Sequence, residues 1–110
     1  MRIAIPVTED EQVAHGWGKA ENLAIVDVSD GEIANWRVEH VGWRELHDEG
    51  THGSHHARIV RFCRDNGITD VIVDHMGEGM QNTLTKLGLK LHQTEISGAR
   101  EAVKALIQQQ

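Results

Sequence analysis

Hydrophobic positions predict three strands in the first part of the chain. Apolar residues alternate along residues 3–7, run almost without interruption over 23–28, and alternate again over 33–41. The Asp30-Gly31 pair between the last two segments is typical of a tight hairpin turn, so we expect these two strands to be antiparallel neighbours. The polar segment 8–19 is predicted to be a long loop.

Helical and strand patterns alternate in the rest of the chain. Apolar residues recur at helical spacing in three segments, and two short apolar runs lie between these segments. The predicted elements are a helix from about Ser54 to Asn66, a strand at 71–73, a helix from about Gly79 to Gly88, a strand at 89–91 and a final helix that Ser97 caps. Residues 43–52 are predicted to be a polar loop.

This order of elements predicts one α/β domain over residues 1–110 with a mixed five-stranded sheet. A meander of three strands followed by right-handed crossovers places the ends of the first, third, fourth and fifth strands at one edge. Ligands of open α/β sheets bind beyond the carboxyl ends of strands, at the point where the connections diverge. That point is expected between the first and fourth strands.

Composition narrows the possible partners. Seventeen acidic residues against eleven Lys and Arg give a net charge of -6, and no continuous basic run occurs, so nucleic acid and membrane surfaces are not expected partners. No signal peptide or membrane-spanning segment is recognisable, which predicts a cytoplasmic protein. The one cysteine, Cys63, excludes an internal disulfide and a cluster held by four thiolates. We expect Cys63 to be a buried core residue.

Eight histidines are the strongest chemical signal, and the predicted topology brings all of them toward the same edge. His52, His55 and His56 have the spacing of one helical face, and together with His47 they form a candidate tetrahedral metal site. A polar loop that is merely rich in histidine is the alternative, because the positive end of a helix repels a bare cation. His40 is expected to be a partly buried histidine, and His92 a surface residue.

A second set of candidates surrounds the expected ligand site. His75 follows the fourth strand, and His15 lies in the first loop beside Gly16 and Gly18, where glycines let backbone amides approach a ligand. Trp17, between these glycines, is interpreted as covering the ligand or a partner surface. Two helices begin at this edge, so an anionic metal centre is favoured over a bare cation. The candidate cofactor-binding residues are His15, Gly16, Trp17, Gly18, His75, Met76 and Gly77.

Several segments resemble the dinitrogenase iron-molybdenum cofactor biosynthesis family, which includes NifX, the NafY cofactor-binding domain and the C-terminal region of NifB. The resemblance rests on residues 1–7 (MRIAIPV), 15–20 (HGWGKA), 25–28 (IVDV) before Asp30-Gly31-Glu32, the loop rich in His and Gly before the first helix, 67–73 (GITDVIV) and the closing helix from Ser97. The chain departs from the common pattern at 74–77 (DHMG), where many members have consecutive glycines, and at Trp17, where Phe is usual.

The resemblance implies a ribonuclease H-like, three-layer α/β/α fold with sheet order 3-2-1-4-5. It also implies a cofactor carrier without enzymatic activity. Family members hold iron-molybdenum cofactor, its iron-sulfur precursors or, in the orange protein, a molybdenum-copper sulfide cluster. Such clusters arrive preassembled and need few protein ligands, so the missing thiolates are no obstacle. Cofactor-assembly or acceptor proteins are then the expected partners.

Two other functions are weighed against a cofactor carrier. A simple zinc- or nickel-binding protein, or a histidine-based sensor, would use the same imidazoles and would hold a divalent metal as purified. Two-metal nuclease chemistry needs carboxylates that converge on the sheet. Asp27 and Asp74 are the best-placed acids, and the predicted topology separates them to opposite edges. The carrier is therefore the favoured hypothesis.

Overall fold

The computed structural model describes residues 1–109, and of His52 it describes only the backbone. Five strands and four helices occur in these residues. In chain order they are β1 (Arg2–Val7), β2 (Asn22–Ser29), β3 (Glu32–His40), α1 (Trp43–His47), α2 (His52–Asp65), β4 (Asp70–Val73), α3 (Glu78–Lys86), β5 (Lys90–Gln93) and α4 (Ala99–Gln108). None of the helices in residues 1–109 is both long enough and apolar enough to cross a membrane.

The strands form one mixed sheet in the order β3-β2-β1-β4-β5, which confirms the predicted order. β1, β2 and β3 are antiparallel neighbours, whereas β4 lies parallel to β1, and β5 parallel to β4. The hairpin turn between β2 and β3 has positive φ at both Asp30 and Gly31, as a type I′ turn requires. The carboxyl ends of β1 and β4 therefore lie side by side.

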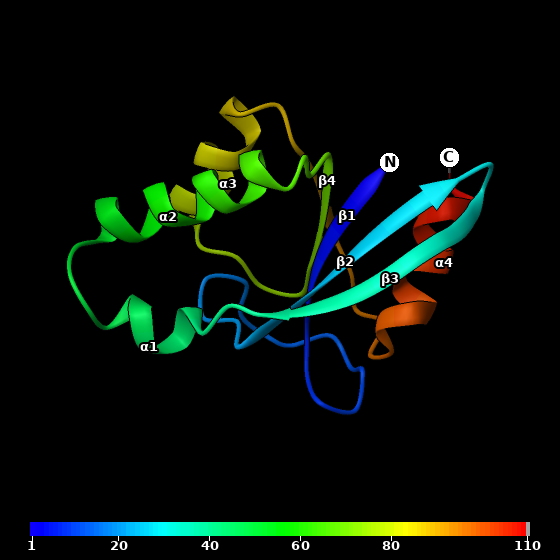
Figure 1. Ribbon diagram of the computed structural model, residues 1–110, viewed down its shortest axis with the longest axis horizontal. Helices are drawn as coiled ribbons and strands as arrows, with labels where there is room; N and C mark the ends of the chain where they lie inside the picture. Colours follow the sequence, from blue (N-terminus) through cyan, green and yellow to red (C-terminus); the bar gives the residue numbers. More distant parts are fainter. Residues whose placement is uncertain (110) are drawn as a thin grey trace.

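Helices cover both faces of this sheet, as Figure 1 shows, with α2 and α3 on one face and α4 on the other. The alternation within β1 separates the two cores: Ala4 packs with the side chains of α2 and α3, and Ile3 and Ile5 pack with those of α4. All three side chains are fully buried. The sheet is thus the middle layer of an α/β/α arrangement.

The structure corrects two local predictions. Residues 43–47, expected to be loop, form the short helix α1, because Trp43 is buried and anchors the segment to the core. Ser97 does not cap α4: the N-cap is Gly98, which makes no side-chain hydrogen bond. The start of α2, unlike that of α4, has side-chain caps. The side chains of Thr51 and Ser54 each accept a hydrogen bond from the other's backbone amide, which forms a capping box.

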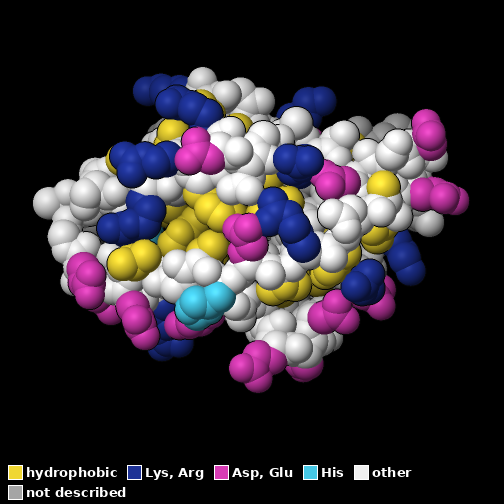
Figure 2. Space-filling view, viewed as in Figure 1, with side chains coloured by type: hydrophobic (Ala, Val, Ile, Leu, Met, Phe, Trp, Pro, Cys, Tyr) yellow, Lys and Arg dark blue, Asp and Glu magenta, His cyan; other side chains and the backbone are white. Residues whose placement is uncertain are grey.

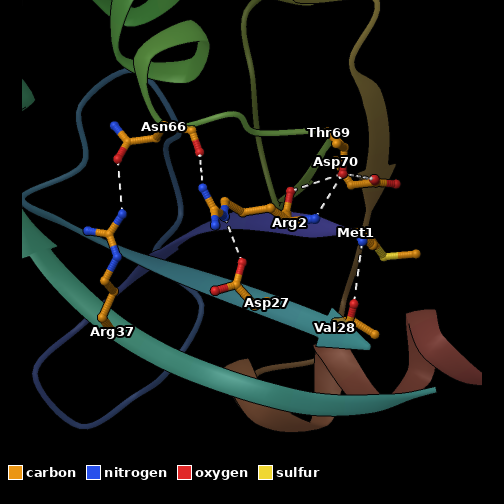
Figure 3. Close-up of polar contacts among 8 residues, drawn as sticks. All are labelled: Met1, Arg2, Asp27, Val28, Arg37, Asn66, Thr69 and Asp70. Atoms are coloured by element: carbon orange, nitrogen blue, oxygen red, sulfur yellow. Dashed lines mark hydrogen bonds and ion pairs between the residues drawn. The ribbon is translucent and has the colours of Figure 1, made fainter. Parts of the chain in front are cut away.

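Polar contacts join β1 to the carboxyl end of α2, at the edge of the sheet opposite the predicted ligand site (Figure 3). Arg2 Nε donates to Asp27 Oδ1 at 2.6 Å, and Arg2 Nη1 donates to the carbonyl of Asn66 at 2.7 Å. Asn66 is the C-cap of α2, where a cation complements the helix dipole. Gly67 follows with φ of 63°, a left-handed conformation that favours glycine after a helix.

The contact with Arg2 predicts a pH-dependent contribution to stability. The hydrogen bond from Arg2 holds the pKa of the Asp27 carboxyl below its ordinary value of 3.8. A carboxylate whose pKa is lower in the folded state stabilises the fold above 3.8, and this stabilisation is lost as the pH falls through the folded value. We expect Asp27→Asn to lower the free energy of urea unfolding at neutral pH, and the difference from wild type to shrink below pH 3.8.

The matched control is Glu95→Gln, which removes an exposed carboxylate elsewhere on the surface. It should leave the free energy of unfolding unchanged within about 0.5 kcal/mol at both pH values. A deficit in Asp27→Asn that stayed constant across this range would contradict the titration of Asp27 as its cause.

Candidate functional site

Backbone hydrogen bonds tie the loop after β1 to the loop after β4. The amide of His75 donates to the carbonyl of His15 at 2.9 Å, and the amide of Trp17 donates to the carbonyl of His75 at 3.0 Å. Gly16 and His75 thereby form a short parallel bridge that continues the pairing of β1 with β4. Two loops that are distant in sequence are thus held together at the carboxyl edge of the sheet.

This bridge places two exposed imidazoles face to face. The rings of His15 and His75 are stacked with centroids 5.3 Å apart and an angle of 5° between their planes. His15 Nδ1 lies 3.0 Å from Asp74 Oδ2. An ionised carboxylate only accepts hydrogen bonds, so Nδ1 carries the proton and Nε2 keeps its lone pair for a ligand. A carboxylate that orients a histidine in this way is the usual outer partner of a metal-binding imidazole.

A cavity of about 800 Å³ opens beside His15. Its walls come from the end of β1, the loop after it, the facing ends of β2 and β3, and α1. The lining residues are Val7, Thr8, Glu9, Ala14, His15, Gly16, Lys19, Ala20, Glu21, Asn22, His40, Arg44 and Asp48. Lys19 and Arg44 bring two fixed positive charges to this cavity.

A second, smaller cavity of about 280 Å³ lies between the loop after β1 and the amino ends of α2 and α3. Its lining residues are Gly18, His47, His55, His56, Gly77, Gly79 and Met80. The amino end of α3 packs closely here, since a Cβ on Gly79 would lie 3.3 Å from His56 Cε1. This cavity therefore combines three imidazoles with the positive end of a helix dipole.

Three of the predicted cofactor-binding glycines border open space. A Cβ placed on Gly16, Gly18 or Gly77 would meet no atom within 4 Å. Gly16 lines the larger cavity, whereas Gly18 and Gly77 line the smaller one. Without a side chain, each of these residues leaves its backbone open to a bound molecule.

His55 holds the smaller cavity together from within. Its side chain is buried, with Nε2 2.7 Å from the carbonyl of Gly18 and Nδ1 2.9 Å from Arg58 Nη1. Because arginine can only donate, Nδ1 accepts and Nε2 donates, so the ring is neutral. Burial lowers the pKa of His55 further. Nε2 thus fastens α2 to the loop after β1, whereas Nδ1 is occupied by Arg58 of the same helix.

The structure does not assemble the four-histidine metal site as a tetrahedral centre in its described part. The rings of His47 and His55 are close, with centroids 5.2 Å apart, but they meet edge to face. The side chain of His52 lies outside the described part of the structure. Among the side chains that are described, no group of three or more His, Cys, Asp or Glu is arranged to hold a metal ion. His47, His55 and His56 stay candidates only as walls of the smaller cavity.

Not all eight histidines gather at one edge, so that prediction is wrong. His92 was expected at the surface, yet its Nε2 lies 2.8 Å from Oδ2 of Asp70, the buried first residue of β4. A buried carboxylate needs such a donor, and the ring therefore turns toward the start of the strand. His40, expected to be partly buried, is exposed, contacts Asn22 and lines the larger cavity.

Two candidate side chains are buried in the core. Trp17, interpreted as a cover over the ligand, is fully buried and packs edge to face against Trp43 at 5.4 Å. Its position between two glycines did not indicate burial, because the residue it packs against, Trp43, lies in α1, a helix that was not predicted. The Met76 side chain is also in the core, with 6% of its surface exposed. Only their backbones, in the two bridged loops, border the site.

Cys63 is buried as predicted, and burial raises the pKa of its thiol to about 12. At pH 8 the thiolate fraction is then on the order of one in ten thousand, and thiol reagents attack the thiolate. We expect the native protein to resist labelling by a disulfide reagent at pH 8 and the guanidinium-unfolded protein to react at once. Rapid labelling of the native protein would show that Cys63 is accessible, contrary to its place in the core.

Sequence reasoning missed three contributors to the site. Lys19 and Arg44 line the larger cavity, and Asp74 orients His15. Lys19 stands within the segment HGWGKA, so its place beside His15 was a usable signal. Arg44 had none, because its segment was expected to be loop.

Comparison with known proteins places the chain in a family. Residues 1–109 match the model of the dinitrogenase iron-molybdenum cofactor family. An uncharacterized protein of Methanocaldococcus jannaschii is 23% identical over 109 residues, which cover 98% of this chain and 86% of that protein.

Solved structures share the fold. A Thermotoga protein with a proposed assignment as NifB superposes with a TM-score of 0.73 and 24% identity, over 97% of this chain and 87% of its own. The apo form of the orange protein from Desulfovibrio gigas superposes with a TM-score of 0.74 and 20% identity, over 99% and 88% of the two chains. At these identities the likeness concerns the fold alone. The match over residues 1–109 is the finding that identifies the chain: it belongs to the dinitrogenase iron-molybdenum cofactor family.

Proposed function

We propose that this protein binds and carries an iron-molybdenum-type or related metal-sulfur cofactor during metallocofactor biosynthesis. The observation that carries the proposal is the stacked pair of His15 and His75, which the bridged loops hold at the carboxyl ends of β1 and β4. Asp74 leaves His15 Nε2 as a ligand atom, and the imidazole of His75 lies beside it. Two imidazoles at one edge suit a preassembled cluster, which needs few protein ligands.

The surroundings of the histidine pair suit a ligand with negative charge. Lys19 and Arg44 line the larger cavity, and Gly16 leaves space for a cluster to approach the backbone. Glu9, Glu21 and Asp48 also line this cavity, so its cations are balanced and an anion must compete with carboxylates. We therefore place the cofactor against His15, His75 and Gly16, with Gly18, Gly77 and the backbones of Trp17 and Met76 as further contacts.

Carriage is favoured over catalysis by the positions of the strand acids. Asp27 pairs in register with Arg2 at the beginning of β1, whereas Asp74 follows the end of β4. The parallel pairing of β1 with β4 puts these two carboxylates at opposite edges of the sheet. Two-metal hydrolysis needs carboxylates at one place, and Asp27 and Asp74 do not provide such a pair.

The family and the names of its structural neighbours support the same class of function, since one neighbour has a proposed assignment as NifB and another is an apo orange protein. We extend the proposal to a cytoplasmic carrier of ribonuclease H-like fold, built as one domain over residues 1–110. Its cargo is iron-molybdenum cofactor, a precursor or another Mo, Fe or Cu sulfide cluster, and its partners are cofactor-assembly or acceptor proteins.

The test is anaerobic loading of the purified protein. One sample receives isolated iron-molybdenum cofactor, a second receives tetrathiomolybdate with copper, and a third receives zinc or nickel alone. After gel filtration, metal analysis and visible absorption report what stays bound. The proposal expects a sulfide cluster to be retained at a fixed ratio to protein. Retention of zinc or nickel without either cluster would instead support the alternative of a simple divalent-metal protein.

A further inference from the structure

An unusual charge distribution marks α2 in this acidic protein. The helix has three arginines and a single carboxylate, Asp65, at its last position. Elsewhere in the chain, acidic residues outnumber Lys and Arg by about two to one. In Figure 2, which has the orientation of Figure 1, Lys and Arg side chains gather over the part of the surface where α2 runs.

The three arginines, Arg58, Arg61 and Arg64, follow one another at intervals of three residues along the outer side of the helix. The opposite side carries the buried Ile59 and Cys63. Arg61 and Arg64 are exposed, and Arg58 is half-buried. We call these three side chains the arginine stripe. It is invisible as a run in the sequence, because the helix alone brings the residues into line.

Within the described chain, the arginine stripe makes few contacts that would stabilise the fold. Ion pairs with carboxylates occupy Arg2, Arg37 and Arg100, but none of the ion pairs among the described residues includes a member of the stripe. Arg58 donates to His55, which accounts for its place. Like charges at this spacing repel, whereas the helix dipole favours Arg64, which lies in the last turn of α2. Ion pairs of the described residues therefore account for neither Arg61 nor Arg64.

We propose that the arginine stripe is a docking surface for an acidic patch on a partner protein. That this partner exchanges the cofactor with the present protein rests on the proposed function. Arginine is enriched at protein interfaces and pairs carboxylates in bidentate fashion. A helix of 14 residues is about 21 Å long, comparable to the width of a standard interface. A longer polyanion such as nucleic acid would extend beyond α2. Acidic residues predominate in the rest of the chain, and their negative charges would repel it.

The first residue of the stripe lies next to the smaller cavity, because Arg58 bonds His55, which lines that cavity. His55 and His56, on the same helix, line the smaller cavity, and Arg44, on the adjacent helix α1, lines the larger one. α1 and α2 are in contact. A protein that binds along α2 thus reaches the smaller cavity at Arg58, whereas Arg64 lies toward the opposite edge of the sheet.

The test uses fluorescently labelled poly-L-glutamate as the probe and measures its anisotropy against the whole protein at low salt and at about 0.15 M salt. Arg61→Glu/Arg64→Glu reverses two charges in the stripe. Lys90→Glu/Lys104→Glu makes the same change in net charge at exposed positions on β5 and α4. We expect the stripe variant to bind the probe at least about tenfold more weakly than wild type, and the lysine variant to differ by less than about threefold.

Equal losses in the two variants would overturn the proposal, because net charge rather than the stripe would control binding. Absence of probe binding by wild type would overturn it as well. So would stronger binding of single-stranded DNA with the same dependence on Arg61 and Arg64, or self-association of wild type that the stripe variant abolishes. Cluster loading of the stripe variant should equal that of wild type, so a failure of loading in both reflects on the proposed function and not on the stripe.

Discussion

Replacement of His15 and His75 together by alanine is expected to abolish retention of a metal-sulfur cluster. The two rings are stacked 5.3 Å apart at the meeting point of β1 and β4, and together they supply the imidazole ligands of the proposed site. Removing both leaves backbone amides and the cations of the larger cavity, which hold an anion without a coordinate bond. Metal analysis after gel filtration of the loaded protein should show at least about a tenfold loss.

Two companion variants sharpen this result. Asp74→Asn keeps both imidazoles but replaces the carboxylate that orients His15, so a loss of about tenfold in affinity, smaller than that of the double variant, is expected. His92→Gln removes a histidine whose ring faces Asp70 at the start of β4, and the glutamine amide can still donate to Asp70, so this variant should load like wild type. Because the side chains of His15 and His75 are exposed, stability should change by less than about 0.5 kcal/mol. Undiminished loading of the double variant would refute the histidine pair as ligands.

Trp17→Ala is expected to have the largest effect on stability. The Trp17 side chain is fully buried, and it packs against Trp43 of α1, which in turn packs against Phe62 of α2. Truncating a buried tryptophan typically costs about 3–5 kcal/mol, because apolar area is lost and a cavity remains. Denaturation by urea, followed by far-UV circular dichroism, should register a decrease of this size in the free energy of unfolding.

Trp17→Phe is the matched control. Phenylalanine keeps an aromatic ring for the contact with Trp43 and removes the indole N–H, which is buried without a hydrogen-bond partner among the described atoms. Since an unsatisfied buried donor is itself costly, part of the lost packing is offset and the variant should be much closer to wild type. A decrease below about 1 kcal/mol for Trp17→Ala would mean that the loop is not anchored by this residue.

The elements of the sheet were predictable because their signals are local. The apolar alternation of residues 3–7, the Asp30-Gly31 turn and the short apolar run at 71–73 each reflect burial and backbone preferences of a few neighbouring residues. The rule that crossovers are right-handed then ordered the strands, and the observed sheet agrees. α1 escaped prediction because five residues are too few to show a helical period, and the core contacts of Trp43 and Leu46 hold it in place.

The site was predictable in place but less so in detail. The approach of His15 to His75 followed from strand order alone, since adjacent parallel strands end side by side. The burial of Trp17 did not follow, because glycines on both sides describe a loop and not what lies beneath it. The inward turn of His92 depended on Asp70, a carboxylate that no local pattern connects with it.

Sequence by itself therefore determined the strands and main helices, the topology that joins β1 to β4, and the resemblance to the family. Tertiary structure alone decided which imidazoles face a cavity and which histidines are committed to hydrogen bonds. The physical reason is the range of the interactions. Burial patterns and turns act over a few residues, whereas ring stacking and desolvation depend on groups that only the folded chain brings together.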